Sequence, residues 1–400
     1  MATRAGVGFS NDADAAVAAA AAVADARNRI GGAPDLCLVF SGAGYDPARL
    51  LASLAEAAPG ARLVGCSAEG VIAGGASTET EHSVAVLAVR SDTLAFETFL
   101  VRDYAADPAR AGTALGERVR AVARGDEFAL LVFPDGLVGN CGALLGALDA
   151  SLPPGIRVAG GAAGDGLTFS RTWQFEGRDA VSDAVAAVLV RGPGRLELAV
   201  SHGCRPIGLE RHVTRAADGW IREIDGQPAW QLFREYLDGD PEDLNTEGII
   251  HLSVGEPLPE SLTGEYEPFL IRSPMGLDKA SGALFFPGGG VPEHAAIRLT
   301  RRDPDGVRDS ARRCAANIAA RSAGAEPAMV LQFDCAGRGR QMFGSHAAEM
   351  IVRPLQEALG GGSAWIGFHT YGEIAPIGGR TFYHNFTVAL CAIYDTTDGR

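Results

Sequence analysis

The chain has 400 residues, which is enough for two packed domains or for one large domain built from repeats. A hydrophobic content of 47% excludes general disorder, and a net charge of -14 without a basic patch argues against a role on nucleic acid or at a membrane. All but one of the 35 basic residues are arginine, so Lys279 alone is available for lysine-dependent chemistry.

The seven cysteines are scattered along the chain without any C-x-x-C pair. This pattern fits neither a disulfide framework nor a zinc module. We therefore expect a cytoplasmic protein that holds no metal.

An alanine-rich run from Ala15 to Ala24 follows two candidate helix caps, Ser10 and Asp12. Alanine has the highest helix propensity, so the run predicts a surface helix within an N-terminal segment of residues 1–30. The acidic flanks of the run are unlike those of a signal peptide, and the run is too short to span a bilayer.

Three later segments share one plan, in which a strand, a helix and a second strand lead through a glycine-rich turn to a further strand. The first repeat contains 36–40, 47–58, the turn after Gly65 and 82–89. The second contains 129–133, 141–152, the turn 160–166 and 183–190. The third contains 329–333, 346–359, the segment 367–373 and 384–393.

The first strand of each repeat is apolar throughout, which is typical of a strand buried on both faces and joined by a helix to a parallel neighbour. Short polar connections to the later strands favour antiparallel pairing. The pattern predicts an α/β (mixed α+β) fold with two domains, 31–217 and 218–395, and a tail at 396–400. Each domain would be built from repeated strand-helix-strand-strand units, with mixed β-sheets flanked by helices.

A fourth, decayed repeat is expected at 228–272, where a helix at 228–237 precedes a strand at 248–254. The glycine-rich turns of the three clear repeats either bring a ligand close to the backbone or simply allow tight turns. None of them opens a helix in a G-x-G-x-x-G motif, so a dinucleotide fold is not expected.

Polar side chains gather where the first strand of the third repeat ends, at residues 333–340. Ligands of α/β sheets usually bind at such strand ends. Arg338 and Arg340 are suited to clamp a carboxylate, and Asp334 to receive an amine. The alternative is a structural ion pair between Asp334 and an arginine.

A second polar set follows in the same repeat and comprises His369, Tyr371, Glu373, His384 and Asn385. This set suits a small zwitterion, whereas a metal site would need histidine and carboxylate at tighter spacing. His369 is either a structural residue or a metal or haem ligand.

Between the two predicted domains, the segment 201–208 offers His202, Cys204 and Arg205 to an interdomain cleft. Cys66, Cys204 and Cys335 are candidate nucleophiles, but the sequence supplies no evident base or oxyanion hole for them. No Ser-His-Asp order is present either, so we expect no catalysis.

At these residues the chain resembles the FIST family, sensory proteins with paired N-terminal and C-terminal FIST domains that are found in bacterial signalling and in a eukaryotic F-box protein. The resemblance covers about residues 31–395. It rests on VGCSAEGVI (64–72), AGGAAGDGLTF (159–169), WQFEG (173–177), SHGCRPIG (201–208), IREIDGQPAW (221–230), EYEPFLIR (265–272), FDCAGRG (333–339), GFHTYGEIAP (367–376) and FYHNFT (382–387).

The resemblance implies a sensor that binds a small ligand, such as an amino acid or related metabolite, without a cofactor. Some members of the family are haem-binding nitric oxide sensors that regulate a histidine kinase, which is the alternative for this chain. Because the sequence shows no kinase, cyclase or F-box segment, the output would pass through a separate protein such as a histidine kinase.

Together, the residues and the resemblance predict a pocket in which Arg205 and Arg338 bind a carboxylate and Asp334 or Glu373 holds an amine. The residues expected to bind ligand are Arg205, Phe333, Asp334, Cys335, Arg338, Tyr371, Glu373 and Asn385, with Cys66, Asp165 and Cys204 in a secondary role. For the haem alternative, the axial ligand would be His202, His369 or His384.

Overall fold

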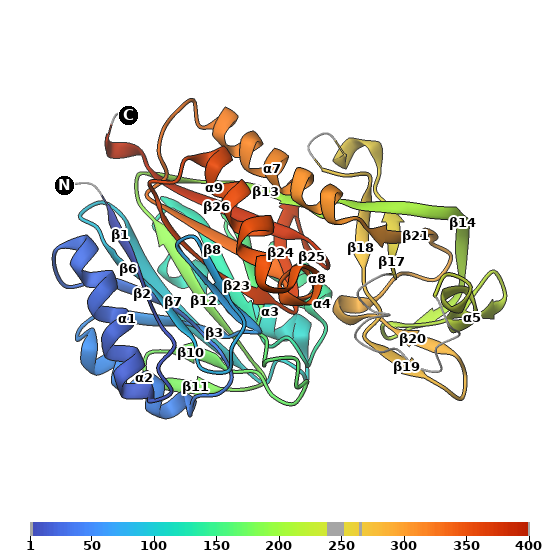
Figure 1. The fold of residues 1–400 in the computed structure, drawn as a ribbon, viewed down its shortest axis with the longest axis horizontal. Helices are drawn as coiled ribbons and strands as arrows, with labels where there is room; N and C mark the ends of the chain where they lie inside the picture. The colour runs from blue at the N-terminus through green and yellow to red at the C-terminus, as the bar shows by residue number, and fades with distance from the viewer. Residues whose placement is uncertain (1–2, 238–251, 264–265, 399–400) are drawn as a thin grey trace.

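A computed structural model describes residues 3–237, 252–263 and 266–398 of the chain. The large body contains three six-stranded sheets, and a smaller lobe projects from one side of it (Figure 1). The chain passes from the body to the lobe through the long strand β14 (Cys204–Ala217). No helix in the described part of the chain is both long and apolar enough to cross a bilayer.

The body consists of three structural units with one element order. Unit 1 comprises β1 (Arg4–Ser10), α1 (Ala15–Ile30), β2 (Leu36–Ser41), α2 (Pro47–Ala57), β3 (Arg62–Ser67), β4 (Gly70–Ala73), β5 (Ala76–Thr78) and β6 (Val84–Arg90). Unit 2 comprises β7 (Ala95–Arg102), α3 (Pro108–Val122), β8 (Glu127–Pro134), α4 (Cys141–Ser151), β9 (Arg157–Ala162), β10 (Gln174–Glu176), β11 (Asp179–Val181) and β12 (Ala184–Arg191).

Unit 3 follows the same order but carries the lobe after its first strand. It comprises β13 (Gly194–Ser201), α7 (Pro304–Arg321), β22 (Met329–Cys335), α8 (Arg340–Phe343), α9 (Arg353–Leu359), β23 (Ala364–Thr370), β24 (Gly372–Ile377), β25 (Arg380–His384) and β26 (Val388–Asp395). The lobe comprises β14, β15 (Trp220–Ile224), β16 (Gln227–Pro228), α5 (Ala229–Arg234), β17 (Leu252–Pro257), β18 (Phe269–Arg272), β19 (Gly276–Asp278), β20 (Ala283–Phe285) and β21 (Ala296–Arg302).

Each sheet of the body is completed by a hairpin from another unit. The hairpin β10–β11 of unit 2 extends the sheet of unit 1, which has the order β1-β6-β2-β3-β10-β11. The hairpin β24–β25 of unit 3 extends the sheet of unit 2, and β4–β5 of unit 1 extends the sheet of unit 3. This cyclic exchange gives the body an approximate three-fold symmetry and makes every unit depend on another.

The three sheets surround one common core. Phe40, Phe133 and Phe333 occupy equivalent positions of β2, β8 and β22, and their ring centroids lie 5.5 to 6.4 Å apart in edge-to-face contacts. Phe368 of β23 packs against all three of them. The opposite face of each sheet is covered by the helices of its own unit, which explains why the first strands are apolar on both faces.

One glycine in each unit is required by the close approach of two parallel strands. A Cβ atom on Gly65, Gly160 or Gly367 would collide with a carbonyl oxygen of the neighbouring strand, that of Val39, Val132 or Gln332 respectively. These glycines therefore belong to strands β3, β9 and β23, and the turns begin a few residues later.

A ring of three equivalent backbone hydrogen bonds closes one end of the core. The N–H of Glu69 donates to the carbonyl oxygen of His369, that of Gly164 to Ser67, and that of Tyr371 to Ala162, each at 3.1 Å. Each bond joins two different units, so the ends of β3, β9 and β23 meet around the three-fold axis.

The predicted α/β fold is confirmed, with mixed sheets that are flanked by helices and built from repeated units. The alanine-rich helix extends to Ile30 and is capped by Asp14 instead of Ser10 or Asp12, because the Asp14 carboxylate accepts the N–H groups of Ala16 and Val17. Residues 4–10, for which no element was predicted, form β1.

The helix predicted at 346–359 is present, but it is not α-helical throughout. A 3-10 turn (Gly344–His346) and a π turn (Ala348–Val352) precede α9. Pro354 explains the interruption, because it has no N–H to donate to the preceding turn. The helix expected at 228–237 is the shorter α5, and residues 248–251 of the strand expected at 248–254 lie outside the described residues.

We expect Phe133→Ala to destabilise the protein by about 3 to 5 kcal/mol, because it leaves a cavity where the three sheets meet. Chemical denaturation followed by circular dichroism measures the change in the free energy of unfolding. Leu209→Ala is the control, since this leucine is 74% exposed and its truncation should alter stability by less than about 0.5 kcal/mol. Equal effects of the two substitutions would contradict a shared core.

Candidate functional site

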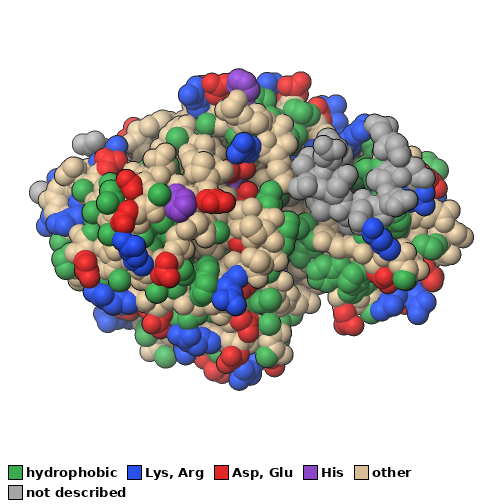
Figure 2. Space-filling view, turned by 60° about the horizontal axis from the view of Figure 1, so that its bottom comes forward, with side chains coloured by type: hydrophobic (Ala, Val, Ile, Leu, Met, Phe, Trp, Pro, Cys, Tyr) green, Lys and Arg blue, Asp and Glu red, His purple; other side chains and the backbone are tan. Residues whose placement is uncertain are grey.

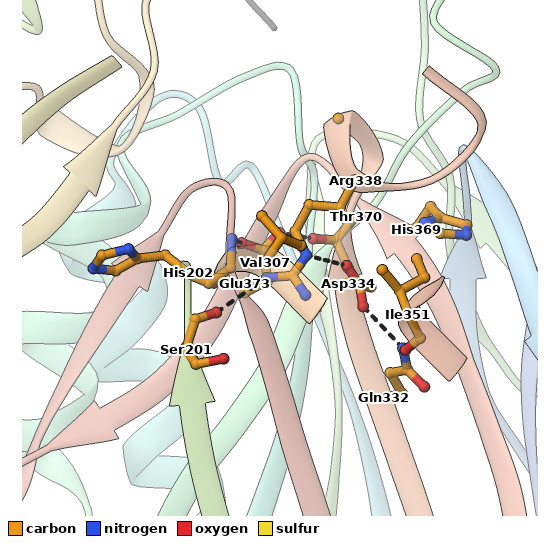
Figure 3. A network of polar contacts seen from close by, with 12 residues as sticks. Ser201, His202, Val307, Gln332, Asp334, Arg338, Ile351, His369, Thr370 and Glu373 are labelled. Carbon is orange, nitrogen blue, oxygen red and sulfur yellow. Dashed lines mark hydrogen bonds and ion pairs between the residues drawn. The ribbon is translucent and has the colours of Figure 1, made fainter. Parts of the chain in front are cut away.

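A buried group of polar side chains lies where β22 and β23 of unit 3 end (Figure 3). Its members, here called the unit 3 cluster, are Asp334, Arg338, Thr370, Glu373 and Thr387. All five side chains are fully buried. The cluster thus places charged groups deep in protein, where they persist only with partners.

Asp334 and Arg338 form the ionic centre of the cluster. Nε of Arg338 lies 2.9 Å from Oδ1 of Asp334, because a 3-10 turn (Ala336–Arg338) folds the chain back over the end of β22. Gln332 donates to Oδ2 of Asp334 at 2.8 Å, and Nη1 of Arg338 donates to the carbonyl oxygen of Ser201 at 3.2 Å. Nη2 of Arg338 has no hydrogen-bond partner within the described residues.

Glu373 provides a second carboxyl group with unusual protonation. Its oxygens accept hydrogen bonds from the hydroxyls of Thr370 and Thr387, both at 2.6 Å, and from the backbone N–H of Thr387 at 3.1 Å. Burial raises the pKa of Glu373 to about 8 despite these bonds, and Asp334 pushes it in the same direction. The Glu373 side chain is therefore mostly protonated near pH 7.

The three-fold symmetry of the body provides an internal comparison for the cluster. Strand pairing aligns Asp334 with Ser41 of unit 1 and Pro134 of unit 2. It aligns Glu373 with Val71 and Gln174, and Thr387 with Ser83 and Ala184. Ionisable side chains occupy these positions only in unit 3, so the shape of the fold does not require them.

The lobe contacts the backbone close to the cluster at two places. Arg302 of β21 donates to the carbonyl oxygen of Gly337 and lies over the ring of Phe386, 4.0 Å from its centroid. Arg272 of β18 donates to the carbonyl oxygen of Tyr383 at 2.7 Å. Any movement of the lobe would therefore pull on the backbone beside the cluster.

His202 and His384 both contact the ring of Tyr266, with ring centroids 5.6 and 5.8 Å from that of the tyrosine. Nδ1 of His202 accepts the N–H of Cys204, and Nε2 of His384 bonds to the carbonyl oxygen of Ala375 at 3.0 Å. Burial lowers the pKa of both imidazoles, to about 3 for His384, so both are neutral near pH 7.

The three histidines considered for haem do not fit it as they are arranged. His369 points away from Arg338 (Figure 3), and its Nε2 pairs with the hydroxyl of Ser77 at 2.8 Å. Like His202 and His384, it is enclosed by protein. A haem would have to displace the contacts that each ring makes.

The seven cysteines are all buried, and burial raises the pKa of every one, for example to about 12 for Cys204. Reactive thiols need the opposite environment, because the thiolate is the nucleophile. Cys204 and Cys335 pack together with Ile271 and Phe386 in a small apolar cluster between the lobe and unit 3. Cys66 belongs to the common core.

The remaining predicted residues do not join the unit 3 cluster. Arg205 follows the buried Cys204 on β14, so its side chain points outward, is 71% exposed and pairs with Asp303 at 2.9 Å. Phe333 faces the common core because side chains alternate along β22. Asn385 accepts the N–H of Ser273 at the junction with the lobe. Tyr371 bonds to Asp165 on the three-fold axis.

The site or its surroundings also include Thr370, Thr387 and the lobe arginines Arg272 and Arg302, for which we predicted no role. Three of them, Thr370, Thr387 and Arg272, do fall within the family motifs 367–376, 382–387 and 265–272. Alignment of the three repeats would have singled out the threonines, since units 1 and 2 carry alanine or serine there. The arginines had no such signal, because the lobe has no counterpart in the other units.

Comparison with known proteins gives a family match across most of the chain. A family model described as FIST N domain matches residues 35–227, and one described as FIST C domain matches residues 229–376. An uncharacterized protein of Mycobacterium tuberculosis is 34% identical over 98% of this chain and 100% of its own length.

Two solved structures match over nearly the whole chain at low similarity. A chorismatase structure has 11% identity and a TM-score of 0.37, and covers 98% of this chain and 99% of its own. A cyanuric acid hydrolase has 10% identity and a TM-score of 0.33, with coverage of 98% and 100%. Since both are enzymes, our expectation that the chain is not an enzyme was wrong to exclude catalysis. At these TM-scores the likeness assigns no reaction to it.

We expect Glu373 to make the protein less stable as pH rises from its ordinary pKa of 4.5 to about 8. In this range the folded protein keeps a proton that the unfolded chain has lost. The free energy of unfolding therefore falls as pH rises, by at most about 1.4 kcal/mol per pH unit. Glu373→Gln, which imitates the protonated acid, should flatten this decline in denaturation measured from pH 5 to pH 8.

Glu117→Gln is the matched control, because Glu117 is exposed on α3. It should leave the pH dependence as in the unsubstituted protein. Parallel stability curves for Glu373→Gln and the unsubstituted protein would show that Glu373 is ionised in the folded state.

Proposed function

The chain belongs to the FIST family, and we propose that it is a sensor that binds a small zwitterion, such as an amino acid, at the unit 3 cluster. In this proposal binding changes how the lobe sits on the body. A separate signalling protein, such as a histidine kinase of the cytoplasm, would then read the change.

One observation supports the proposal most directly: at the equivalent positions of the three units, only unit 3 carries ionisable residues, Asp334 and Glu373. Buried charges cost free energy, and a purely structural need would have placed them in all three units. Units 1 and 2 adopt the same fold with Ser41 and Pro134 where unit 3 has Asp334. A function specific to unit 3 accounts for this difference.

The chemistry of the cluster favours a ligand with both a carboxylate and an amine. Nη2 of Arg338 is a donor with no hydrogen-bond partner in the described chain, which suits a carboxylate oxygen. Asp334 is the anionic partner for an ammonium group. Glu373, which is mostly protonated near pH 7, would serve as a neutral hydrogen-bonding group.

Burial of the cluster connects ligand binding to movement of the lobe. The side chains of Asp334 and Arg338 are inaccessible, so a ligand enters only when the covering elements shift. Arg302 attaches the lobe to Gly337, between Asp334 and Arg338, and Arg272 attaches it to Tyr383 of β25, the strand that pairs with β24 beside Glu373. The lobe forms a distinct bulge beside the body (Figure 2), which suits a part that moves as a unit.

We expect Arg338→Lys to weaken binding of the recognised amino acid by about 2 kcal/mol or more, because lysine keeps the charge but loses the planar donor pair. Calorimetric titration of the purified protein with each common amino acid identifies the ligand and measures the change. Arg205→Lys is the matched control, because Arg205 is exposed on β14 and should leave the affinity unchanged.

Small-angle scattering with and without the bound amino acid tests the movement of the lobe. The proposal would be abandoned if no amino acid bound the unsubstituted protein, or if Arg338→Lys bound it with undiminished affinity. A ligand that binds without any change in the scattering profile would remove the lobe from the mechanism.

A further inference from the structure

A second polar group lies on the three-fold axis, apart from the unit 3 cluster. Its members, here called the axial cluster, are Glu69, Asp165 and Tyr371. They lie in the turns that follow β3, β9 and β23, so each unit contributes one polar side chain from the same turn. The ring of backbone hydrogen bonds that joins the units passes through Glu69 and Tyr371 themselves. Three separate segments therefore bring these groups to one place.

Asp165 is the ionised member of the axial cluster, and its oxygens are already occupied. They accept the hydroxyls of Tyr371 and Thr168 and the N–H groups of Phe169, Ser170 and Arg171. Burial alone would raise the pKa of Asp165, but these hydrogen bonds outweigh it and lower the pKa below its ordinary value. A negative charge is thus fixed on the axis.

Glu69 is the member with free binding capacity. It is only 8% exposed, and its Oε2 has no hydrogen-bond partner among the described residues. Burial, together with the carboxylates of Glu79 and Asp165, raises its pKa to about 8. Oε1 of Glu79 lies 3.6 Å from Nε2 of the His369 imidazole, but within the described residues no arginine or lysine forms an ion pair with Glu69, Glu79 or Asp165.

An aromatic pair lies beside these carboxylates and reaches the surface. The rings of Tyr371 and Phe169 are stacked, with centroids 5.3 Å apart and an angle of 24° between their planes. Phe169 is 47% exposed even though it is a large apolar side chain. Aromatic faces next to carboxylates recognise organic cations, since the ring attracts the cation and packs against its alkyl part.

We propose that the axial cluster is a second binding site, which takes a small primary amine in its ammonium form. The ammonium group would donate to Oε2 of Glu69 with Asp165 and Glu79 nearby, and its alkyl chain would lie along Phe169 and Tyr371. Glu69 would bind it as the carboxylate, so an amine that enters displaces the proton of that group.

The same residues do not suit a metal ion. No group of three histidine, cysteine or carboxylate side chains in the described chain is placed to hold a metal. The oxygens of Asp165 already accept hydrogen bonds from six donor groups, whereas Mg²⁺ or Ca²⁺ would need several oxygens free at once. One available oxygen beside an aromatic face fits a hydrogen-bonding ammonium group better.

Titration of the full-length protein with putrescine, followed by calorimetry at pH 8, tests the site. We expect saturable binding that Glu69→Gln weakens by about tenfold or more, because the amide keeps the shape of the side chain but cannot become anionic. Phe169→Ala should weaken binding by about two- to fivefold. The control is Glu81→Gln, which removes a carboxylate from an exposed residue of the same unit.

Circular dichroism establishes that Glu69→Gln is folded, and its affinity for the amino acid bound at the unit 3 cluster should equal that of the unsubstituted protein. Absence of putrescine binding at millimolar concentration would overturn the site. Equal weakening by Glu69→Gln and Glu81→Gln would also overturn it, because it would reduce the effect to overall charge. Neither result bears on the unit 3 cluster, which is tested with different residues and a different ligand.

Discussion

The cyclic exchange of hairpins between units is the constraint on which the rest of the structure depends. No unit completes its own sheet, since the last two strands always come from a neighbour. The exchange forces the three sheets around one core, in which Phe40, Phe133 and Phe333 meet. It also brings the ends of β3, β9 and β23 onto the axis, where three backbone hydrogen bonds lock them together.

Comparison of the three equivalent units distinguishes the residues that the fold requires from those that it does not require. Gly65, Gly160 and Gly367 recur because two strands approach too closely for a side chain in every unit. Asp334 and Glu373 do not recur, although each is buried at a position that the other units fill without ionisable groups. The apolar contacts of the shared core come from all three units, and they can offset the unfavourable free energy of burying such ionisable residues.

Local patterns were sufficient to predict the central strands and helices of each unit and their repetition, but not β1 or the strand and helix that open units 2 and 3. Continuous apolar strands, helices of the right length and recurrent glycines identify the three units and the mixed sheets. Asp334 and Arg338 could be paired from their spacing, which matches one turn of chain at a strand end. By contrast, the prediction that Arg205 and Arg338 share one site was wrong. Side chains alternate along β14, so a shift of one residue decides whether a side chain points into the protein or out of it.

The sequence by itself determined the central strand-helix-strand part of each unit, its buried strands and the many polar groups of the third repeat, because local residue patterns are enough to indicate these features. Only the tertiary structure decided which unit receives each hairpin, and so which side chains share a site. Tyr371 joins Asp165 across 206 positions of sequence, while its neighbour Thr370 turns to Glu373. Such choices depend on the packing of all three sheets at once, and no local pattern carries that information.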